Sequence, residues 1–378
     1  MTASRPRVLQ IVTSLAVGGA QRHLLELLPG LRQFADIDLV YFRDHDLRPE
    51  FEACVERIAH IPMAGPFGAV RLPLLATLIR RGRYTLVHTH LLRADMYGAL
   101  AARAVGVRAI MSSKHNIEAR LESAAARAIH ALATRPTRRT IAISEAVAGW
   151  TNQQLGVPSD RIEVIRYGLD AAPFSGLDRA AARRELGVEA HAPLLLCPAR
   201  LDPQKRHDVL LRAFARVRRK LGNAQLLCAG ETQLGGPAYR ARLLQLTDDL
   251  GLRDAVRWLG VRSDIPNLMA AADVVVLASD WEGLGLVVME AAMASRPVVA
   301  TAVGGVPEIV EHNKTGLLVP QGDEQALASE LTAVLLDTER RVRMGSGARR
   351  HAAEAFDLEG MRAATRALYA SVIRDVAA

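Results

Sequence analysis

Short apolar runs alternate with longer amphipathic segments along this chain, and the alternation starts again near residue 193. The apolar runs, each of strand length, cover residues 7–12, 37–41, 86–88, 108–112, 140–143 and 162–165, and then 193–198, 224–229, 256–259, 274–278, 298–301 and 316–319. Between them lie helical patterns, among them 91–104, 117–133, 209–221 and 239–250. Strands that alternate with helices indicate parallel sheets covered on both faces. The fold class is therefore α/β, with two doubly wound parallel sheets.

The stretch 167–174 divides the two series, because it is rich in turn residues and lacks a helical period. A chain of 378 residues also exceeds what one ordinary core organises. We expect a first Rossmann-like domain over 1–170, a second over 171–355, and a C-terminal helix over 356–378 that crosses back to the first. Two such domains facing each other across a cleft would bind ligands at the carboxyl ends of their strands.

Positive charge is concentrated in the first half of the chain. Residues 1–170 hold 22 basic and 15 acidic side chains, whereas the remaining 208 residues hold 26 and 25. Local clusters occur at Arg80, Arg81 and Arg83 and at Arg135, Arg138 and Arg139. The asymmetry indicates an anionic partner such as lipid headgroups, an acidic substrate or nucleic acid, and solvated Arg-rich helix faces explain it equally well.

Several features bear on the compartment. Cys54, Cys197 and Cys228 are widely spaced and form no C-x-x-C pair, which is typical of core residues in a reducing compartment. The apolar segment 8–17 breaks at a glycine pair and runs into an amphipathic helix, so it predicts a first strand rather than a signal peptide. No apolar stretch reaches the roughly 18 residues of a membrane span. We expect a cytoplasmic protein.

Arg200 and Lys205 follow the predicted strand 193–198 where it ends. Two fixed cations five residues apart on such a loop suit two neighbouring phosphates. Only four of the 48 basic residues are Lys, and one of them stands here. Ordinary surface charge in an Arg-rich chain is the alternative.

Two carboxylates follow the predicted strand 274–278. We expect Glu282 in a loop pointing into the cleft, and Glu290 in the second turn of a helix that opens near Gly285. A carboxylate among apolar neighbours requires hydrogen-bond donors, and sugar and ribose hydroxyls are suitable ones. The free N–H groups of the helix would face an anion such as a pyrophosphate. The alternative for Glu290 is a helix cap or a core ion pair.

Glycine pairs follow two predicted strands, at Gly18-Gly19 and Gly304-Gly305, where the backbone can approach a ligand closely. Neither place has the G-x-G-x-x-G or P-loop pattern, so neither a nicotinamide cofactor nor ATP hydrolysis is indicated.

Histidines also fall at predicted strand ends of the first domain, at His88, His90 and His115. His88 and His90 have no Asp, Glu or Cys at ligand spacing, so no metal site is predicted. A lone histidine is more often structural. His115, between Lys114 and Asn116, is the better candidate for a residue in the cleft.

Taken together these residues resemble the GT4 family of retaining, nucleotide-sugar-dependent glycosyltransferases, which have the GT-B fold. Glu282 and Glu290 match the family's E-x7-E signature, and Arg200 and Lys205 match its R-x4-K pair. The family's next conserved stretch is matched by Gly304, Gly305, Glu308, Ile309, Val310, Gly316, Leu317, Leu318 and Val319. In the first domain the family's glycine loop, active-site histidine and a further short motif resemble Gly18–Gln21, His115 and Ile143–Ala146. The resemblance covers nearly the whole chain and is strongest from Pro198 to Pro320.

The resemblance implies retaining transfer of a sugar from a UDP- or GDP-linked donor to a glycan or lipid-linked acceptor, as in the synthesis of cell-envelope polysaccharide, lipopolysaccharide or glycolipid. Arg200 and Lys205 would neutralise the leaving diphosphate, without a metal or other cofactor. Glu290 would hold the ribose, and Glu282 the transferred sugar. The implied catalytic residues are His115, Arg200, Lys205 and Glu282, and the donor site further includes Gly19, Gly283, Leu284, Gly285, Leu286 and Glu290. The acceptor-side candidates are Gly18, His90, Lys114 and Asn116.

Three positions depart from the family pattern and bear on donor choice. Tyr167 stands in place of a usual Asn, Ala229–Thr232 replace a more glycine-rich loop, and Arg296 replaces a small residue.

Other function classes remain open at this point. A sugar-nucleotide epimerase or a phosphorylase uses the same fold, although these lack this E-x7-E context and a phosphorylase requires a Schiff-base lysine. A non-catalytic nucleotide-binding or scaffold protein is a further alternative, against which the retention of all four charged site residues argues. Nucleic-acid binding is disfavoured because aromatic residues are only 4% of the chain and are not interleaved with the arginines.

Peripheral membrane contact is also predicted, on the cytoplasmic face of the inner membrane. The segment 67–78 followed by Arg80, Arg81 and Arg83 would lie on anionic headgroups. An ordinary amphipathic helix packed on its sheet is the alternative.

Overall fold

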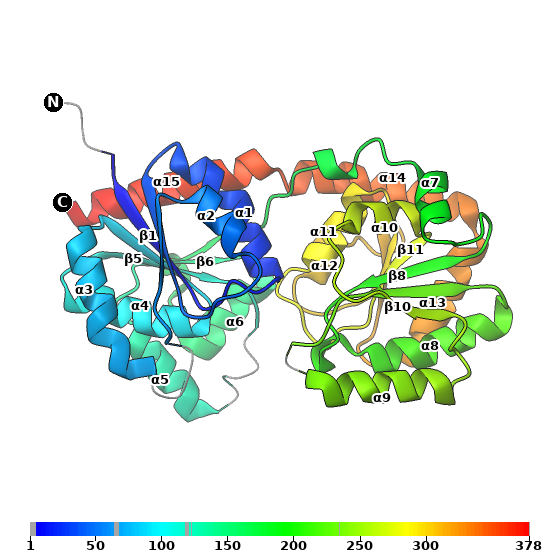
Figure 1. Cartoon of the computed structure of the whole chain (residues 1–378). Coiled ribbons are helices and arrows are strands. Elements are labelled where there is room, and N and C mark those ends of the chain that lie inside the picture. Colours follow the sequence, from blue (N-terminus) through cyan, green and yellow to red (C-terminus); the bar gives the residue numbers. More distant parts are fainter. Residues whose placement is uncertain (1–4, 64–67, 118–120, 122, 234, 378) are drawn as a thin grey trace. The chain divides into compact units, whose positions relative to one another are not determined.

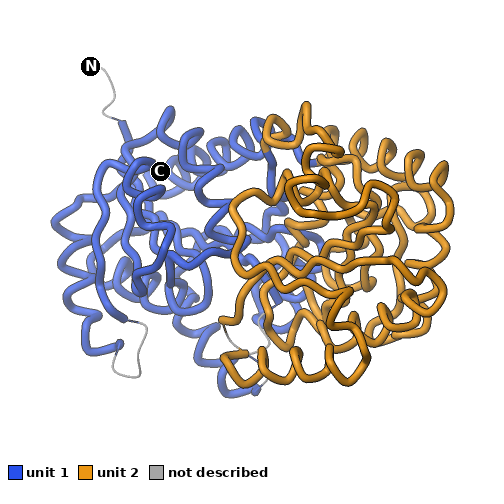
Figure 2. Tube along the Cα trace, turned by 45° about the vertical axis from the view of Figure 1, so that its right-hand side comes forward, with its two compact units in different colours: residues 1–169, 356–378 blue, residues 170–355 orange. Residues whose placement is uncertain are grey.

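The computed structural model describes residues 5–63, 68–117, 121, 123–233 and 235–377. The chain divides into two compact units, unit 1 with residues 1–169 and 356–378 and unit 2 with residues 170–355 (Figure 2). The first part of the predicted helix 117–133, at 118–120 and 122, lies outside the described residues, as does Phe67.

Unit 1 contains one parallel sheet with the strand order β3-β2-β1-β4-β5-β6-β7. Its strands are β1 (Arg7–Val12), β2 (Asp36–Tyr41), β3 (Arg57–His60), β4 (Leu86–His90), β5 (Ala109–Lys114), β6 (Arg139–Ala142) and β7 (Ile162–Val164). The order reverses between β1 and β4, which is the place where a doubly wound sheet opens a crevice at its carboxyl edge.

Helices cover both faces of this sheet (Figure 1). They are α1 (Gly19–Arg32), α2 (Arg48–Cys54), α3 (Leu72–Gly82), α4 (Leu92–Ala104), α5 (Ala124–Thr134), α6 (Glu145–Leu155) and α15 (Leu358–Ala377). Side chains of β1 alternate between two cores: Val8 and Val12 pack with α1 and α15, whereas Leu9 and Ile11 pack with α3 and α4. This period-2 alternation is what places every second strand residue under α15.

Unit 2 contains a second parallel sheet with the order β10-β9-β8-β11-β12-β13. Its strands are β8 (Leu194–Pro198), β9 (Gln225–Ala229), β10 (Val256–Trp258), β11 (Val274–Leu277), β12 (Val298–Thr301) and β13 (Gly316–Val319). Its helices are α7 (Arg179–Glu185), α8 (His207–Lys220), α9 (Gly236–Asp249), α10 (Ile265–Ala271), α11 (Leu286–Met293), α12 (Val306–Ile309), α13 (Glu324–Leu336) and α14 (Thr338–Ala355). Within unit 2, α8 packs with α9 and α13, and α11 packs with α14.

The two parallel sheets with helices on their faces confirm the predicted α/β class. Most predicted strands agree with the structure to within two residues, and β1 and β12 agree at both ends. The edge strand β3 and the helices α2, α7 and α10 were not among the predicted elements. Cys197 and Cys228 are buried as expected, on neighbouring positions of β8 and β9, and Cys54 is half-buried.

Candidate functional site

In unit 2 the strand order reverses between β8 and β11, and the predicted charged residues follow these two strands. Arg200 and Lys205 lie in the loop after β8, which includes a short 3₁₀ turn over Pro203–Lys205. Glu282 lies in the loop after β11. Adjacent parallel strands bring these loops to one place at the carboxyl edge of the sheet, so residues 77 positions apart in sequence become neighbours.

Lys205 and Glu282 form a direct ion pair between the two loops. The Nζ of Lys205 lies 2.6 Å from Oε1 of Glu282, and the hydroxyl of Ser279 donates to the same oxygen at 2.6 Å. The two charged side chains are only 15% and 9% exposed. Weak screening by solvent makes this a strong electrostatic contact that fixes the Glu282 carboxylate.

Further bonds hold the two loops together around this pair. The side-chain amide of Gln204 donates to the carbonyl of Trp281 at 2.6 Å, and the N–H of Asp280 donates to the carbonyl of Gln204 at 2.8 Å. Arg206 donates to the Asp280 carboxylate at 3.0 Å. Sequence reasoning did not find Gln204, Asp280 or Arg206, because their roles depend on which strands are adjacent.

Arg200 lies at the more exposed side of the same edge. Its guanidinium donates to Oε1 of Gln233 at 2.8 Å and lies 3.2 Å from the carboxylate of Asp202. Asp202 is buried and accepts hydrogen bonds from the backbone N–H groups of Gln233 and Gly235. Asp202 therefore connects the Arg200 loop to the loop after β9, while one third of the Arg200 side chain stays accessible.

Two glycines shape the loop that contains Glu282. A Cβ atom on Gly304 would lie 1.8 Å from the carbonyl oxygen of Glu282, and Gly304 also has a φ of +51°. Only glycine permits the backbone at position 304 to come this close to the Glu282 carbonyl. The pair Gly304-Gly305 therefore lets the Glu282 loop pack against it. Gly285, with a φ of +100°, ends the loop and precedes α11.

The remaining predicted donor-site residues lie at the start of α11. No side chain caps this helix, and its first N–H groups stand at the positive end of the helix dipole. Gly283 accepts a bond from the N–H of Gly305, and the side chain of Leu284 is buried in the core. Leu286 and Glu290, one turn apart on α11, are half-buried.

In unit 1 the corresponding edge lies at the carboxyl ends of β1 and β4. Gly18 is the N-cap of α1, with an extended backbone, and Gly19 is the first residue of that helix and is exposed. A Cβ on Gly18 would approach the side-chain oxygen of Gln21 to 2.8 Å. The glycine pair thus brings exposed backbone to the edge of the sheet.

Lys114 is buried and paired with a carboxylate. Its Nζ lies 2.5 Å from Asp95 on α4, and the two side chains are 7% and 1% exposed. Asn116 is half-buried and accepts a bond from the N–H of Ile117. A small cavity beside them is lined by these side chains together with His115, His130 and Trp150.

His90 and His115 are buried in unit 1 and contact each other, with 3.0 Å between ring nitrogens. The other nitrogen of His115 lies 2.8 Å from the hydroxyl of Tyr167, and His23 of α1 stacks on the Tyr167 ring. Burial and the neighbouring Lys114 lower the pKa of His115 to about 3. Sequence reasoning did not find His23, and it treated Tyr167 only as a departure from a family pattern.

Among the residues that the structure describes, no group of three or more His, Cys, Asp or Glu side chains is arranged to hold a metal ion. None of the helices in the described residues has both the length and the apolar character that crossing a bilayer requires.

The chain belongs to the group 1, family 4 glycosyltransferases. The family described as "Glycosyl transferases group 1" matches residues 178–351, and that described as "Glycosyltransferase Family 4" matches residues 17–172. The Family 4 match lies almost entirely in unit 1 and the group 1 match lies within unit 2, so the predicted resemblance is confirmed.

Individual relatives agree with this assignment. A D-inositol 3-phosphate glycosyltransferase of Salinispora arenicola is 30% identical over 375 residues, covering 89% of this chain and 83% of the relative. One from Saccharomonospora viridis is 35% identical over 292 residues, covering 72% of this chain and 66% of the relative, so the match spans about two thirds of that protein. The crystal structure of Anabaena HepE in complex with UDP-glucose is similar with a TM-score of 0.88 and 26% identity, over 97% of this chain and 99% of HepE. This likeness confirms the predicted GT-B type of fold.

Proposed function

We propose that the protein is a retaining glycosyltransferase that moves a sugar from a UDP- or GDP-linked donor to a glycan or lipid-linked acceptor, in the synthesis of a cell-envelope polysaccharide or glycolipid such as lipopolysaccharide. The observation that carries the proposal is the Lys205–Glu282 pair, held at the reversal point of the unit 2 sheet beside the uncapped start of α11. The UDP-glucose complex of the similar HepE supports a nucleotide-sugar donor.

The donor diphosphate binds to Arg200, Lys205 and the N-terminus of α11. The Lys205 ammonium has three N–H donors, so it reaches a phosphate oxygen without giving up Glu282. As the bond to the sugar breaks, negative charge grows on the diphosphate, and two fixed cations in a poorly solvated site stabilise that charge. These two cations supply the positive charge that a divalent ion would otherwise place on the diphosphate. The transfer is therefore metal-independent.

Glu282 and Glu290 bind the transferred sugar and the ribose of the donor. Ser279 and Lys205 both bond Oε1 of Glu282 and fix its carboxylate, whose second oxygen accepts from a sugar hydroxyl. Glu290, half-buried on α11, accepts from the ribose hydroxyls. Leu286, one turn before Glu290, borders the sugar with its apolar side chain.

The acceptor binds to unit 1, at the carboxyl edge formed by Gly18 and Asn116. His115 lies at this edge, and His90 and Lys114 support it from within unit 1. Front-side attack on the donor carbon retains the anomeric configuration. Proton NMR of the first-formed product tests this, since an inverted anomeric signal would contradict retention.

Calorimetric titration of UDP, GDP and ADP into the protein and its Arg200→Ala variant tests the donor site. We expect one nucleotide to bind, and binding to be lost in Arg200→Ala but kept in Arg253→Ala, whose arginine is exposed and paired with Asp248 in the same unit. If none of the three nucleotides binds, a scaffold protein becomes the better interpretation. Conversion of a sugar nucleotide to its epimer without acceptor would favour an epimerase.

Contact with an anionic membrane on the cytoplasmic side is the second part of the proposal. The exposed large apolar side chains in the described part of unit 1 all lie on α3, α4, α5 or the turn before α3, and these helices pack side by side. They are Val70, Leu74, Leu100, Ile129 and Leu132. Arg80, Arg81 and Arg83 at the end of α3 add positive charge to this face, which suits acidic headgroups.

Flotation with anionic liposomes at low and high salt tests this contact. We expect binding at low salt that salt weakens, and a loss of binding in Ile129→Ser/Leu132→Ser. Val261→Ser, which removes an exposed apolar side chain of unit 2, should leave binding unchanged. No flotation of the unaltered protein at low salt rejects the membrane contact without affecting the donor site.

A further inference from the structure

Buried polar side chains of unit 1 form a continuous chain of hydrogen bonds. They come from β1, β4, β5, the loops after β5 and β7, and the C-terminal helix α15. Each is less than one tenth exposed. In order along the chain they are Tyr167, His115, His90, Gln10, Tyr369, His88 and Ser113.

The first half of the chain runs from Tyr167 to Gln10. The Tyr167 hydroxyl lies 2.8 Å from Nδ1 of His115, and Nε2 of His115 lies 3.0 Å from Nδ1 of His90. Nε2 of His90 lies 2.8 Å from Oε1 of Gln10. Both ring nitrogens of each histidine are therefore engaged within unit 1.

The second half runs from Gln10 to Ser113. The amide nitrogen of Gln10 donates to the hydroxyl of Tyr369 at 2.9 Å, and this hydroxyl lies 2.6 Å from Nδ1 of His88. Nε2 of His88 lies 2.8 Å from the hydroxyl of Ser113. The side-chain amide of Gln10 thus joins the two halves, because it accepts on one side and donates on the other.

The three imidazoles are neutral because they are buried. Burial lowers the pKa of His88 and of His115 to about 3, and it lowers that of His90 well below the usual value. A neutral imidazole has one donor and one acceptor nitrogen. In an unbroken chain of such rings, the direction of one bond therefore fixes the direction of every other, and only two arrangements are self-consistent.

Tyr167 distinguishes between the two arrangements. Its hydroxyl is buried, and within the described ranges His115 is its hydrogen-bond partner. If Tyr167 accepted from His115, its own O–H would be left without an acceptor, which costs about 1–3 kcal/mol. At the other end Ser113 borders the small cavity beside Lys114, where its hydrogen can bond to water. Donation therefore runs from Tyr167 toward Ser113, and the placement of the Gln10 amide agrees with it.

We propose that Tyr167 is a positioning residue that holds His115 as a neutral ring protonated at Nε2. In this state Nδ1 of His115 accepts from Tyr167 and its Nε2–H is donated to His90. His115 therefore exchanges no proton with a ligand at the edge of unit 1 while these two bonds last. The inference concerns unit 1 alone and does not depend on donor binding to unit 2.

Nitrogen-15 NMR of the full chain labelled at histidine tests this directly, because long-range ¹⁵N–¹H correlations distinguish a protonated ring nitrogen from one with a lone pair. Signals are assigned with single His→Gln variants. At neutral pH we expect His88, His90 and His115 all to be protonated at Nε2.

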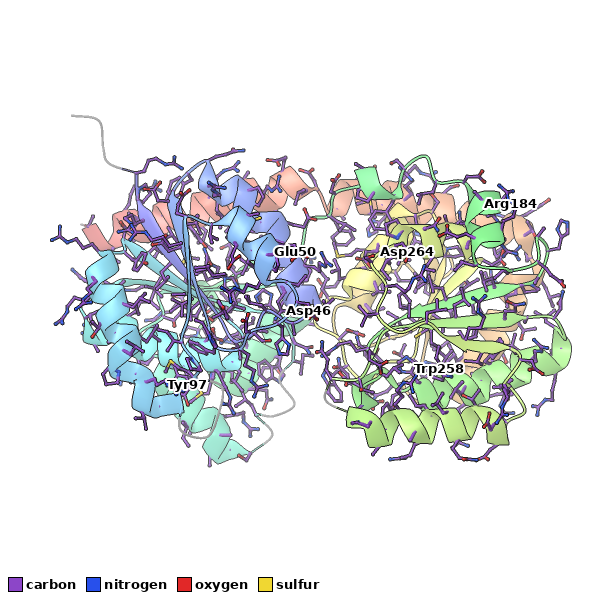
Figure 3. The ribbon with its side chains drawn as sticks, viewed as in Figure 1. Asp46, Glu50, Tyr97, Arg184, Trp258 and Asp264 are labelled. Carbon is purple, nitrogen blue, oxygen red and sulfur yellow. The ribbon has the colours of Figure 1, made fainter. Side chains whose placement is uncertain are left out.

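Two phenol deletions then separate the halves of the chain. Tyr167→Phe removes the donor to Nδ1 of His115, so the ¹⁵N signal of that nitrogen should move toward the position of a lone pair without a hydrogen bond, while Gln10 keeps His90 protonated at Nε2. Tyr369→Phe should have the same effect on Nδ1 of His88 and leave His115 and His90 unchanged. Tyr97→Phe is the matched control, since Tyr97 lies on α4 and packs with the core on the other face of the sheet, away from α15 (Figure 3).

The proposal is overturned if any of the three rings is cationic or protonated at Nδ1 in the unaltered protein. It is also overturned if Tyr167→Phe leaves the ¹⁵N signal of Nδ1 of His115 unchanged, because that nitrogen then had no donor in Tyr167. The spectrum of the unaltered protein is decisive even if a Phe variant does not fold.

Discussion

The ion pair between Lys114 and Asp95 offers a direct measure of how unit 1 tolerates buried charge. Lys114→Met keeps most of the apolar stem of the side chain and removes the ammonium that lies 2.5 Å from the Asp95 carboxylate. Asp95 is 1% exposed, and its other oxygen accepts from the hydroxyl of Thr89 at 2.7 Å. Thr89 remains in the variant, as does His130, whose Nε2 lies 3.9 Å from the same carboxylate and whose ring is neutral because burial and Lys114 lower its pKa to about 3.

Removal of one partner of a buried ion pair typically destabilises a protein by about 3–5 kcal/mol. For a folding unit of this size each kcal/mol lowers the melting temperature by about 2–4 °C, so unit 1 of Lys114→Met should melt about 6–20 °C lower. Thermal unfolding followed by circular dichroism measures the shift, and urea unfolding gives the free energy.

The loss in Lys114→Met should also depend on pH. Burial already raises the pKa of Asp95, against the opposing effect of Lys114, so removal of Lys114 raises the pKa further. Because the folded state then binds the proton more tightly than the unfolded state, stability is lost as pH rises from the ordinary Asp value of 3.8 through the raised folded value. The deficit should therefore be smaller at about pH 5 than at pH 8.

The double variant Asp95→Asn/Lys114→Met is the control, because it removes both charges and should recover most of the lost stability. A free energy of unfolding for Lys114→Met within about 1 kcal/mol of the unaltered protein would refute the reasoning, since such a value belongs to an exposed pair. A deficit that does not change with pH would refute the assignment to Asp95.

Other predictions concern unit 2. Asp273→Ala should destabilise it by about 3–5 kcal/mol in urea unfolding, because Arg183, 2.8 Å from Asp273 and 3% exposed, loses its counter-charge. Gly304→Ala should weaken nucleotide binding about tenfold or more in calorimetry, equivalent to about 1.4 kcal/mol, because the added Cβ displaces the Glu282 loop; Gly322→Ala, at a similar positive φ but in open space, should not. Glu282→Gln should lower turnover about 10²–10³-fold in a donor-hydrolysis or transfer assay while the protein stays folded, and near-normal turnover would remove Glu282 from the mechanism.

Strongly apolar strands could be predicted from the sequence, and weakly patterned edges could not. β1 and β12 are buried along almost their whole length, so their apolar runs mark both ends. β3, Arg57–His60, is an edge strand with both terminal side chains exposed, and it contains no apolar alternation to detect. A parallel strand that is buried on both faces has a continuous apolar run, which can be recognised in the sequence. An edge strand lacks this run.

The candidate site was predictable as a set of residues but not as a set of contacts. Lys205 and Glu282 were identified by residue type and by their position after strands, whereas their ion pair depends on β11 lying beside β8. Gln10 and Tyr369 were missed because they are about 360 residues apart. The sequence did contain one indication of this contact. Gln10 is a polar side chain at a core position of β1, and a buried polar group requires a hydrogen-bond partner.

The C-terminal helix has a consequence for how the chain acquires its structure during synthesis. Met361, Tyr369 and Val372 of α15 belong to the same core as the first strand of unit 1, whereas unit 2 is built from one uninterrupted segment. A ribosome therefore releases every residue of unit 2 before it releases the last layer of unit 1. The usual order, in which the N-terminal domain is completed first, is reversed, and the apolar face of α1 stays uncovered until α15 has been synthesised.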